Sequence, residues 1–290
     1  MSSDGNAYIS WRSGNGNVID NSGNVCQSDV TQAVRLVADY SYGDYVKSHT
    51  YTVTVSPKKA ESHEITLNDN RILRKITVKN VSELETAFSY ATAFSYATAG
   101  DAIIIKNGTY ENCVLTLKAS GTEKNPVFVI AENVGGAVFK GTTSLTFDGD
   151  FVVVAKLSFS NGAPSSDKGC MIFNGDDCRI TNNRIEDFCD ANERKWIYLS
   201  GKRNEVDHNF LSGKSSRGAL LTVWRNDASA QYHHIHHNYF KNYAYGDGGN
   251  GFETIRIGDS SQLQSDAFCL VEYNLFEACN GEIETVSVKS

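Results

Sequence analysis

Apolar and polar residues alternate one by one through the first part of this 290-residue chain. Between residues 7 and 57 the alternation is clearest over 33–42 and 51–55, and polar turn residues separate the alternating runs. A period of two is typical of half-buried β-strands. The pattern predicts a small β domain over 1–57, followed by a linker over 58–73.

A short helix is predicted next, because the apolar spacing lengthens. Ser82 and Glu85 have the spacing of a capping box, so we expect the helix to start at Glu83. It should run through a six-residue duplication, Ala-Phe-Ser-Tyr-Ala-Thr, that fills 87–98, and end at Gly100. Six residues turn a helix by about 600°, so the two copies would face different directions, and we assign the duplication no function.

The rest of the segment 74–290 is quasi-periodic. An asparagine followed by apolar residues recurs at Asn183, Asn209, Asn238 and Asn274, with spacings of 26, 29 and 36 residues. Repeats of about 20–40 residues that each hold one set of short strands indicate a solenoid. We therefore predict an all-β chain in which a right-handed parallel β-helix over 74–290 follows the small β domain. Stacked asparagines should bond the turn backbones, and loops that lengthen toward the C-terminus should form a binding cleft on one face.

Composition narrows the possible functions. The net charge is −7 and no basic stripe is visible, which argues against nucleic-acid binding. The seven cysteines fit no zinc or redox spacing, so we expect buried free thiols. No apolar run reaches the roughly 18 residues of a membrane-spanning helix, and the first residues lack the features of a signal peptide. Either the protein stays inside the cell or a leader is missing, and we expect a monomer.

Oxygen-bearing and basic side chains gather near the C-terminal end. Glu282 and Glu284 are two residues apart, so on a strand both would project from one side while Ile283 enters the core. Together with Asn250, one coil earlier, they would suit Ca²⁺, although Glu-x-Glu is also common on exposed strands. Lys289 would face outward only if a bulge or corner separates it from Glu284.

Other candidates are basic residues. Arg256 and, less clearly, Arg225 alternate with apolar neighbours, which turns them toward substrate or simply toward solvent. A dense histidine cluster lies at 233–237, where His234 and His236 would share one face of a strand. We favour substrate hydrogen bonding or turn packing over zinc ligation there, because no carboxylate pattern accompanies the cluster. No nucleophile elbow, P-loop or dinucleotide fingerprint occurs.

Taken together, these segments resemble a known family. The strings 250–258, 271–276 and 281–290 are similar to those of polysaccharide lyase family 6, which contains alginate lyases and the dermatan-sulfate-cleaving chondroitinase B. The resemblance covers about three quarters of the chain, from Lys75 onward. It implies a right-handed parallel β-helix that cleaves an acidic polysaccharide by β-elimination. Separately, residues 7–57 resemble the second half of a bacterial immunoglobulin-like domain.

The resemblance also implies roles for individual residues. Lys289 matches the general base, which takes the proton from C5 of a uronate. The implied Ca²⁺ ligands are Asn250, Glu282 and Glu284. With the candidates above, the expected substrate-binding residues are Arg225, His234, Glu253 and Arg256. The family also uses an arginine about twenty residues after the lysine, beyond Ser290, so we expect that the sequence is truncated.

The favoured hypothesis is a Ca²⁺-assisted alginate lyase that works outside the cytoplasm, secreted or periplasmic. Alginate is preferred over dermatan sulfate because nothing in the sequence indicates a sulfate pocket. Two alternatives stay open: a non-catalytic β-helix that binds acidic glycans, which the missing arginine favours, and a purely structural solenoid. Removal of Ca²⁺ would separate them, because the structural solenoid has no glycan affinity to lose.

Overall fold

The computed structural model describes residues 7–26, 32–55, 64–89, 97–243, 246 and 249–289. The chain divides into two compact units, 1–64 and 65–290. Regular structure in both units is almost entirely β, which confirms the predicted all-β class. Within the described ranges no helix has the length and apolar character needed to span a membrane.

The first unit is a small antiparallel sheet in the order β1-β2-β3. Its strands are β1 (Ala7–Ser13), β2 (Gln32–Tyr42) and β3 (Tyr45–Val55). Its core consists of four buried residues, Val18, Ile19, Val34 and Val55. The immunoglobulin-like interpretation of this unit stays a prediction.

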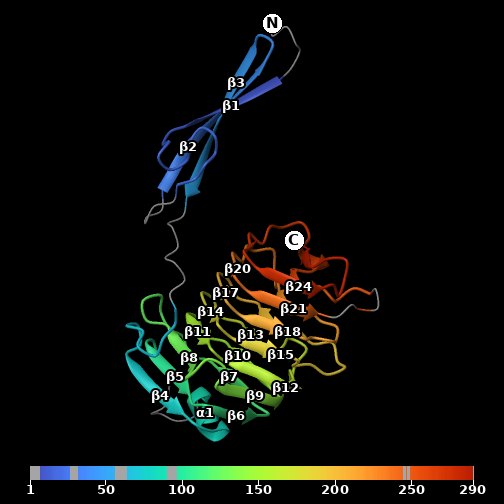
Figure 1. Ribbon diagram of the computed structural model, residues 1–290. Coiled ribbons are helices and arrows are strands. Elements are labelled where there is room, and N and C mark those ends of the chain that lie inside the picture. Colours follow the sequence, from blue (N-terminus) through green and yellow to red (C-terminus); the bar gives the residue numbers. More distant parts are fainter. Residues whose placement is uncertain are drawn as a thin grey trace. The chain divides into compact units, whose positions relative to one another are not determined.

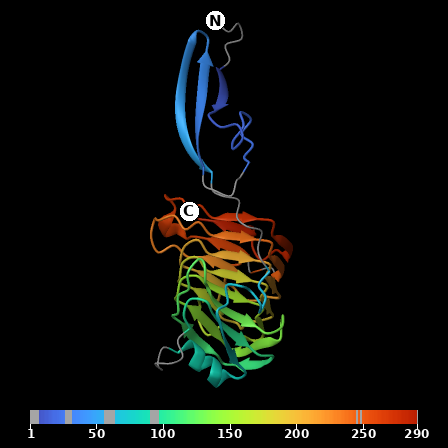
Figure 2. The same ribbon diagram turned by 90° about the vertical axis from the view of Figure 1, so that its left-hand side faces the viewer.

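The second unit is a parallel β-solenoid whose successive coils supply strands to three sheets (Figures 1 and 2). Sheet 1 contains β4 (Arg74–Val78), β5 (Asp101–Ile105), β8 (Val127–Ala131), β11 (Val152–Ala155), β14 (Arg179–Thr181), β17 (Glu205–Asp207), β20 (His234–His236) and β23 (Leu270–Glu272). Sheet 2 contains β6 (Gly108–Glu111), β9 (Ala137–Thr142), β12 (Ser158–Ala163), β15 (Arg184–Glu186), β18 (Phe210–Ser212), β21 (Tyr239–Tyr243) and β24 (Leu275–Cys279). Sheet 3 contains β7 (Val114–Leu117), β10 (Ser144–Phe147), β13 (Met171–Phe173), β16 (Ile197–Leu199), β19 (Leu221–Val223), β22 (Ile255–Ile257) and β25 (Val286–Val288). The predicted parallel β-helix is confirmed.

The repeated asparagines form a ladder at the corner between sheets 1 and 2. The backbone N–H of each donates to the side-chain oxygen of the next one, over 2.9–3.1 Å. The residue before each asparagine has a positive φ of 52–56°, so the chain turns sharply there. This ladder confirms the prediction that stacked asparagines bond the turn backbones.

Apolar side chains stack in register inside the solenoid. Stacked phenylalanine pairs have ring centroids 4.7–5.2 Å apart, at Phe139–Phe159, Phe147–Phe173 and Phe240–Phe276. Neighbouring coils thus bury their aromatic rings against one another, which removes apolar area from water. The result is one continuous core that runs through the unit.

The outer face of sheet 1 is also buried in the first coils. Every residue of β8 and β11 is buried, because Ile65 and its partly buried neighbours Leu67 and Ile72 pack against this face. Residues 65–73, which we expected to belong to the linker, therefore lie in the second unit. Burial on both faces explains the continuous apolar runs of these strands.

The helix α1 (Val81–Phe88) differs from its prediction at both ends. It starts two residues earlier than Glu83, because Asn80 is the N-cap: its side-chain oxygen accepts from the N–H of Glu83 over 2.9 Å. It ends at Phe88, so the expected extension through the duplicated segment is wrong. Most of the duplication, 90–96, lies outside the described residues.

Candidate active site

The candidate site lies where the chain passes from sheet 2 into sheet 3 in the last two coils. The loop between β21 and β22 carries Asn250 and Glu253, and the loop between β24 and β25 carries Glu282 and Glu284. Because β22 and β25 pair in parallel, these loops follow one another along the solenoid. Lys289 comes directly after β25 and lies next to the first loop. The structure thus brings residues together that are up to 39 positions apart.

The segment around Glu282 and Glu284 is a loop, and the strand predicted there is wrong. Ile283, which we expected in the core, is fully exposed at 101%. The chain enters the core only at Val286, which packs against the other buried residues. The bulge or corner that we predicted after Glu284 is this transition from loop to strand.

Lys289 is held by two oxygen atoms. Its Nζ lies 3.2 Å from Oδ1 of Asn250 and 3.4 Å from Oε1 of Glu253. Glu253 is completely buried, and Nε of Arg256 lies 3.9 Å from the same carboxylate oxygen. A buried carboxylate is costly unless it is paired, so these two cations stabilise it. The other oxygen of Glu253, Oε2, has no hydrogen-bond partner among the residues that the structure describes.

Glu282 fixes one loop against the other. Its Oε2 accepts hydrogen bonds from the backbone N–H groups of Gly251, at 2.9 Å, and Phe252, at 2.8 Å. Gly251 has φ 112°, and a Cβ there would lie 2.9 Å from Cγ of Arg217, so this close approach favours glycine. The loop that carries Asn250 is thereby held in place.

The oxygen donors on these two successive loops fit a hard cation. Asn250, Glu282 and Glu284 offer only oxygen atoms, which are the ligands that Ca²⁺ prefers. Oδ1 of Asn250 already attracts the ammonium group of Lys289. These three residues could therefore hold a calcium ion.

Two buried polar residues, Tyr243 and Lys214, lie close to the loops that carry the candidate site. Burial, and then the nearby carboxylates of Glu253 and Glu282, raise the pKa of Tyr243, whose hydroxyl donates to the carbonyl of Gly218 over 2.9 Å. Burial lowers the pKa of Lys214 to about 7. Nζ of Lys214 donates to backbone carbonyls of its own loop, which lies between β18 and β19. It also lies 5.4 Å from the ring centre of Tyr243. Sequence reasoning missed both residues, because burial of a lysine has no local sequence signal.

Arg225 and His234 are not brought to this site. Arg225 is buried, and its guanidinium donates to backbone carbonyls, including that of Ser265 at 2.6 Å and that of Ser229 at 3.2 Å. It joins the loop between β19 and β20, which carries Arg225 itself, to the loop between β22 and β23 in the next coil. His234 lies on β20 in sheet 1, with its Nε2 3.0 Å from Oε1 of Glu272. The prediction that these two residues bind substrate beside Lys289 therefore finds no support in the arrangement.

A cluster of aromatic and basic residues lies on the outer side of sheet 3, where Lys168 is exposed and Tyr198 is 4% exposed. Tyr198 is two strands from Arg256 in the same lateral row. Nζ of Lys168 lies 5.4 Å from the centre of the Tyr198 ring, which stacks on Trp224 at 6.1 Å. Aromatic and basic side chains suit a sugar polymer that carries carboxylates. Repeat register could have found Tyr198, because it occupies the position of Arg256 in an earlier coil.

Comparisons with known proteins agree with this fold. A family model described as Chondroitinase B matches residues 78–290. A mannuronic acid specific polysaccharide family 6 lyase from human gut microbiota is 28% identical, with a TM-score of 0.68 over 75% of this chain and 52% of that one. A PL6 family polysaccharide lyase, Pedsa3628 from Pseudopedobacter saltans, is 29% identical, with a TM-score of 0.64 over 74% of this chain and 49% of that one.

A third similar structure, the PL6 family alginate lyase AlyGC, is 29% identical, with a TM-score of 0.66 over 74% of this chain and 30% of that one. The chain thus spans about half the length of the first two structures and less of the third. No curated protein sequence matches the chain.

Proposed function

Because the chain belongs to the chondroitinase B family of polysaccharide lyases, we propose that it cleaves an acidic polysaccharide by β-elimination. The observation that carries the proposal is the position of Lys289 between Asn250 and the buried Glu253, beside a set of oxygen donors that suits Ca²⁺.

Lys289 acts as the general base. The proton on C5 of a uronate is weakly acidic, because its removal places a second negative charge beside the sugar carboxylate. Lys289 takes this proton, and Glu253 positions the lysine from the buried side. Arg256 directs a second positive charge toward the sugar carboxylate. The bond between C4 and its oxygen then breaks, the oxygen leaves as a hydroxyl after taking a proton from solvent, and a double bond forms between C4 and C5.

Asn250, Glu282 and Glu284 would hold the calcium ion. When bound, the ion would neutralise the uronate carboxylate and so stabilise the negative charge that develops when the C5 proton is removed. Glu282 also keeps the Asn250 loop in place through its two backbone contacts, so it contributes to the geometry of the site before any ion binds.

Alginate is the proposed substrate. The similar structures include a lyase described as mannuronic acid specific and two described as alginate lyases, one of them in complex with a trisaccharide. Dermatan sulfate is the second candidate, because the family model carries the name Chondroitinase B. A protein that acts on either polymer would work outside the cytoplasm, secreted or periplasmic.

Ultraviolet absorbance tests the proposal. The purified chain is mixed with alginate or with dermatan sulfate, in Ca²⁺ and in a chelator. Elimination creates a conjugated uronate that absorbs, whereas hydrolysis or binding does not. We expect a Ca²⁺-dependent rise with alginate. A flat trace with both polymers, together with retained glycan binding, would instead indicate a binding-only β-helix.

Variants assign the roles. Lys289→Ala should abolish the absorbance rise and leave Ca²⁺ and glycan binding in place, whereas Lys124→Ala, which removes an exposed lysine in an early coil, should change neither. Glu282→Gln should weaken Ca²⁺ and glycan binding together, because a carboxylate ligand is lost while an acceptor for the two backbone N–H groups remains. Full turnover by Lys289→Ala would remove this lysine from the mechanism.

A further inference from the structure

The outer face of sheet 1 changes from apolar to ionisable along the solenoid. Its first strands are covered by the 65–73 segment, but from β14 onward the outward positions form two lateral rows of polar residues. One row contains Arg179, Glu205 and His234, and the other contains Thr181, Asp207, His236 and Glu272. This face belongs to a different sheet from the one beside the candidate active site.

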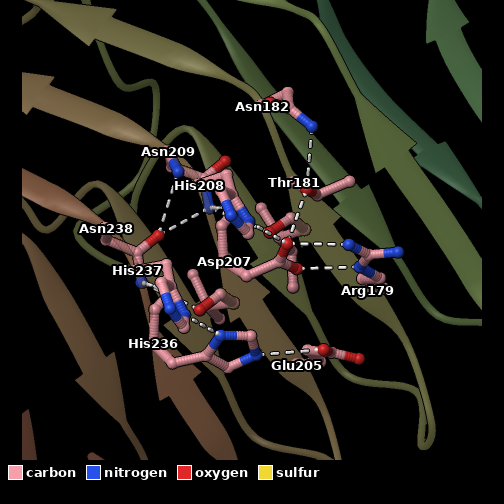
Figure 3. Close-up of polar contacts among 12 residues, drawn as sticks. Arg179, Thr181, Asn182, Glu205, Asp207, His208, Asn209, His236, His237 and Asn238 are labelled. Atoms are coloured by element: carbon pink, nitrogen blue, oxygen red, sulfur yellow. Dashed lines mark hydrogen bonds and ion pairs between the residues drawn. The ribbon is translucent and has the colours of Figure 1, made fainter. Parts of the chain in front are cut away.

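Three side chains in these rows converge. One donor atom each from Glu205, His234 and His236 lies within 4.8 Å of the other two. Oε1 of Glu205 and Nε2 of His236 lie 3.0 Å apart (Figure 3). The side chain of His236 is 7% exposed and that of Glu205 is 13% exposed, whereas His234 reaches solvent at 24%. The cluster is therefore shielded on one side and open on the other.

The second nitrogen of His236 has a partner of its own. Nδ1 of His236 lies 2.8 Å from Nδ1 of His237, and Figure 3 shows the two rings meeting at this contact. When Nε2 is a ligand, the proton therefore resides on Nδ1 and is donated to His237. Histidine ligands of metals almost always have such a hydrogen bond, because it fixes the tautomer and the ring orientation.

Neighbouring charges leave Glu205 as the main anionic donor of the cluster. Asp207 lies on the same strand, but the guanidinium of Arg179 holds both of its oxygens, at 2.8 and 2.7 Å. Glu272, in the next coil, approaches from the other side and contacts Nε2 of His234 at 3.0 Å. It can serve as a fourth ligand after a small rotation.

We propose that Glu205, His234 and His236 bind a divalent transition metal of the zinc class. Imidazole nitrogens suit Zn²⁺ and its neighbours, whereas Ca²⁺ prefers oxygen. Donors at about 2.1 Å from a tetrahedral Zn²⁺ lie about 3.4 Å from one another. Oε1 of Glu205 and Nε2 of His236 are already within about half an ångström of that separation. The third donor atom, from His234, reaches it by adjusting a surface side chain.

The bound metal joins consecutive coils. Glu205 is on β17 and the two histidines are on β20, which pair laterally, and Glu272 on β23 extends the set to a third coil. A metal that binds only the folded chain stabilises it by an amount that grows with the logarithm of the metal concentration over the dissociation constant. The site thus reinforces the coils that carry the candidate active site, and its metal binding does not depend on lyase activity.

Cobalt(II) titration of the full chain tests the proposal, with excess Ca²⁺ present to fill the oxygen-donor site. We expect one equivalent of Co²⁺ to bind with visible d–d bands, without a thiolate charge-transfer band, and to be displaced by Zn²⁺. His236→Gln and His234→Gln should each weaken binding by more than about tenfold. The thermal unfolding midpoint of the solenoid should rise with Zn²⁺ in the unmodified chain but not in these variants.

The controls separate this site from other metal binding. His49→Gln removes an exposed histidine of the first unit and should bind Co²⁺ like the unmodified chain, as should Glu282→Gln. His234 is more exposed than His236, so its variant keeps the test valid if His236→Gln does not fold. Absence of d–d bands, a thiolate charge-transfer band, or unchanged affinity in both histidine variants would overturn the proposal.

Discussion

Replacement of one ladder asparagine by alanine tests how the solenoid satisfies its buried corner. Asn209 occupies the middle of the ladder and is only 2% exposed. Its Oδ1 accepts from the backbone N–H of Asn183 at 2.9 Å and from that residue's side chain at 3.0 Å. Its Nδ2 donates to the carbonyl of Ile180 at 2.8 Å and to Oδ1 of Asn238 at 2.9 Å. One side chain thus joins three coils.

The magnitude follows from the groups that alanine leaves behind. In Asn209→Ala the backbone N–H of Asn183 and the carbonyl of Ile180 lose these partners at a place that water does not reach. Each such group costs about 1–3 kcal/mol. We expect the free energy of unfolding to fall by about 4 kcal/mol. Asn274→Ala is the matched control: it removes the same motif at a half-exposed site, where water replaces the partners, and should cost about 1 kcal/mol.

Urea unfolding followed by tryptophan fluorescence measures the difference. In a Trp11→Phe background the remaining signal comes from Trp196 and Trp224, both in the solenoid, so the first unit does not contribute. The slope against urea should stay unchanged if only native stability is affected. The two variants should differ clearly in the free energy of unfolding that they lose. If the losses for Asn209→Ala and Asn274→Ala agreed within about 0.5 kcal/mol, burial would not be what makes the ladder hydrogen bonds costly to remove.

Three further predictions concern residues around the last coils. Burial lowers the pKa of His233 from 6.5 to about 4, so the unfolded chain binds more protons than the folded chain between these pH values. The free energy of unfolding should therefore fall by about 3 kcal/mol as the pH drops from 6.5 to 4. His233→Gln should show a smaller fall in urea midpoint over the same pH range. Arg225→Met should cost about 3 kcal/mol, because buried carbonyls lose their donor, and should increase limited proteolysis within 259–269. Gly251→Ala should weaken Ca²⁺ affinity measured by calorimetry, by about 1–2 kcal/mol, because its φ of 112° and the close side chain of Arg217 displace the loop.

Local sequence patterns predicted the elements that repeat. The four asparagines and the stacked phenylalanines recur at coil spacing, and each coil needs the same turn and the same inward residues. The predicted start of the helix at Glu83 was wrong, because Asn80 and Ser82 are both suitable N-cap residues by type. Only the hydrogen bond from the N–H of Glu83 to Asn80 distinguishes them. The prediction that Ile283 enters the core was wrong for a related reason. An apolar residue between two glutamates has the pattern of a strand whether or not the chain is extended there.

Residue types and their spacing predicted by themselves that this chain forms a solenoid and that oxygen-bearing and basic side chains gather near its C-terminal end, whereas the roles of Asn250 and Lys289 were implied by the resemblance to polysaccharide lyase family 6. Only the tertiary structure decided which candidates meet. It placed Lys289 against Glu253, buried Arg225 under backbone carbonyls, and moved His234 to another sheet. The physical reason is that lateral neighbours in a solenoid are separated by a whole coil. Loop lengths, which vary freely between coils, set the register that brings these side chains together.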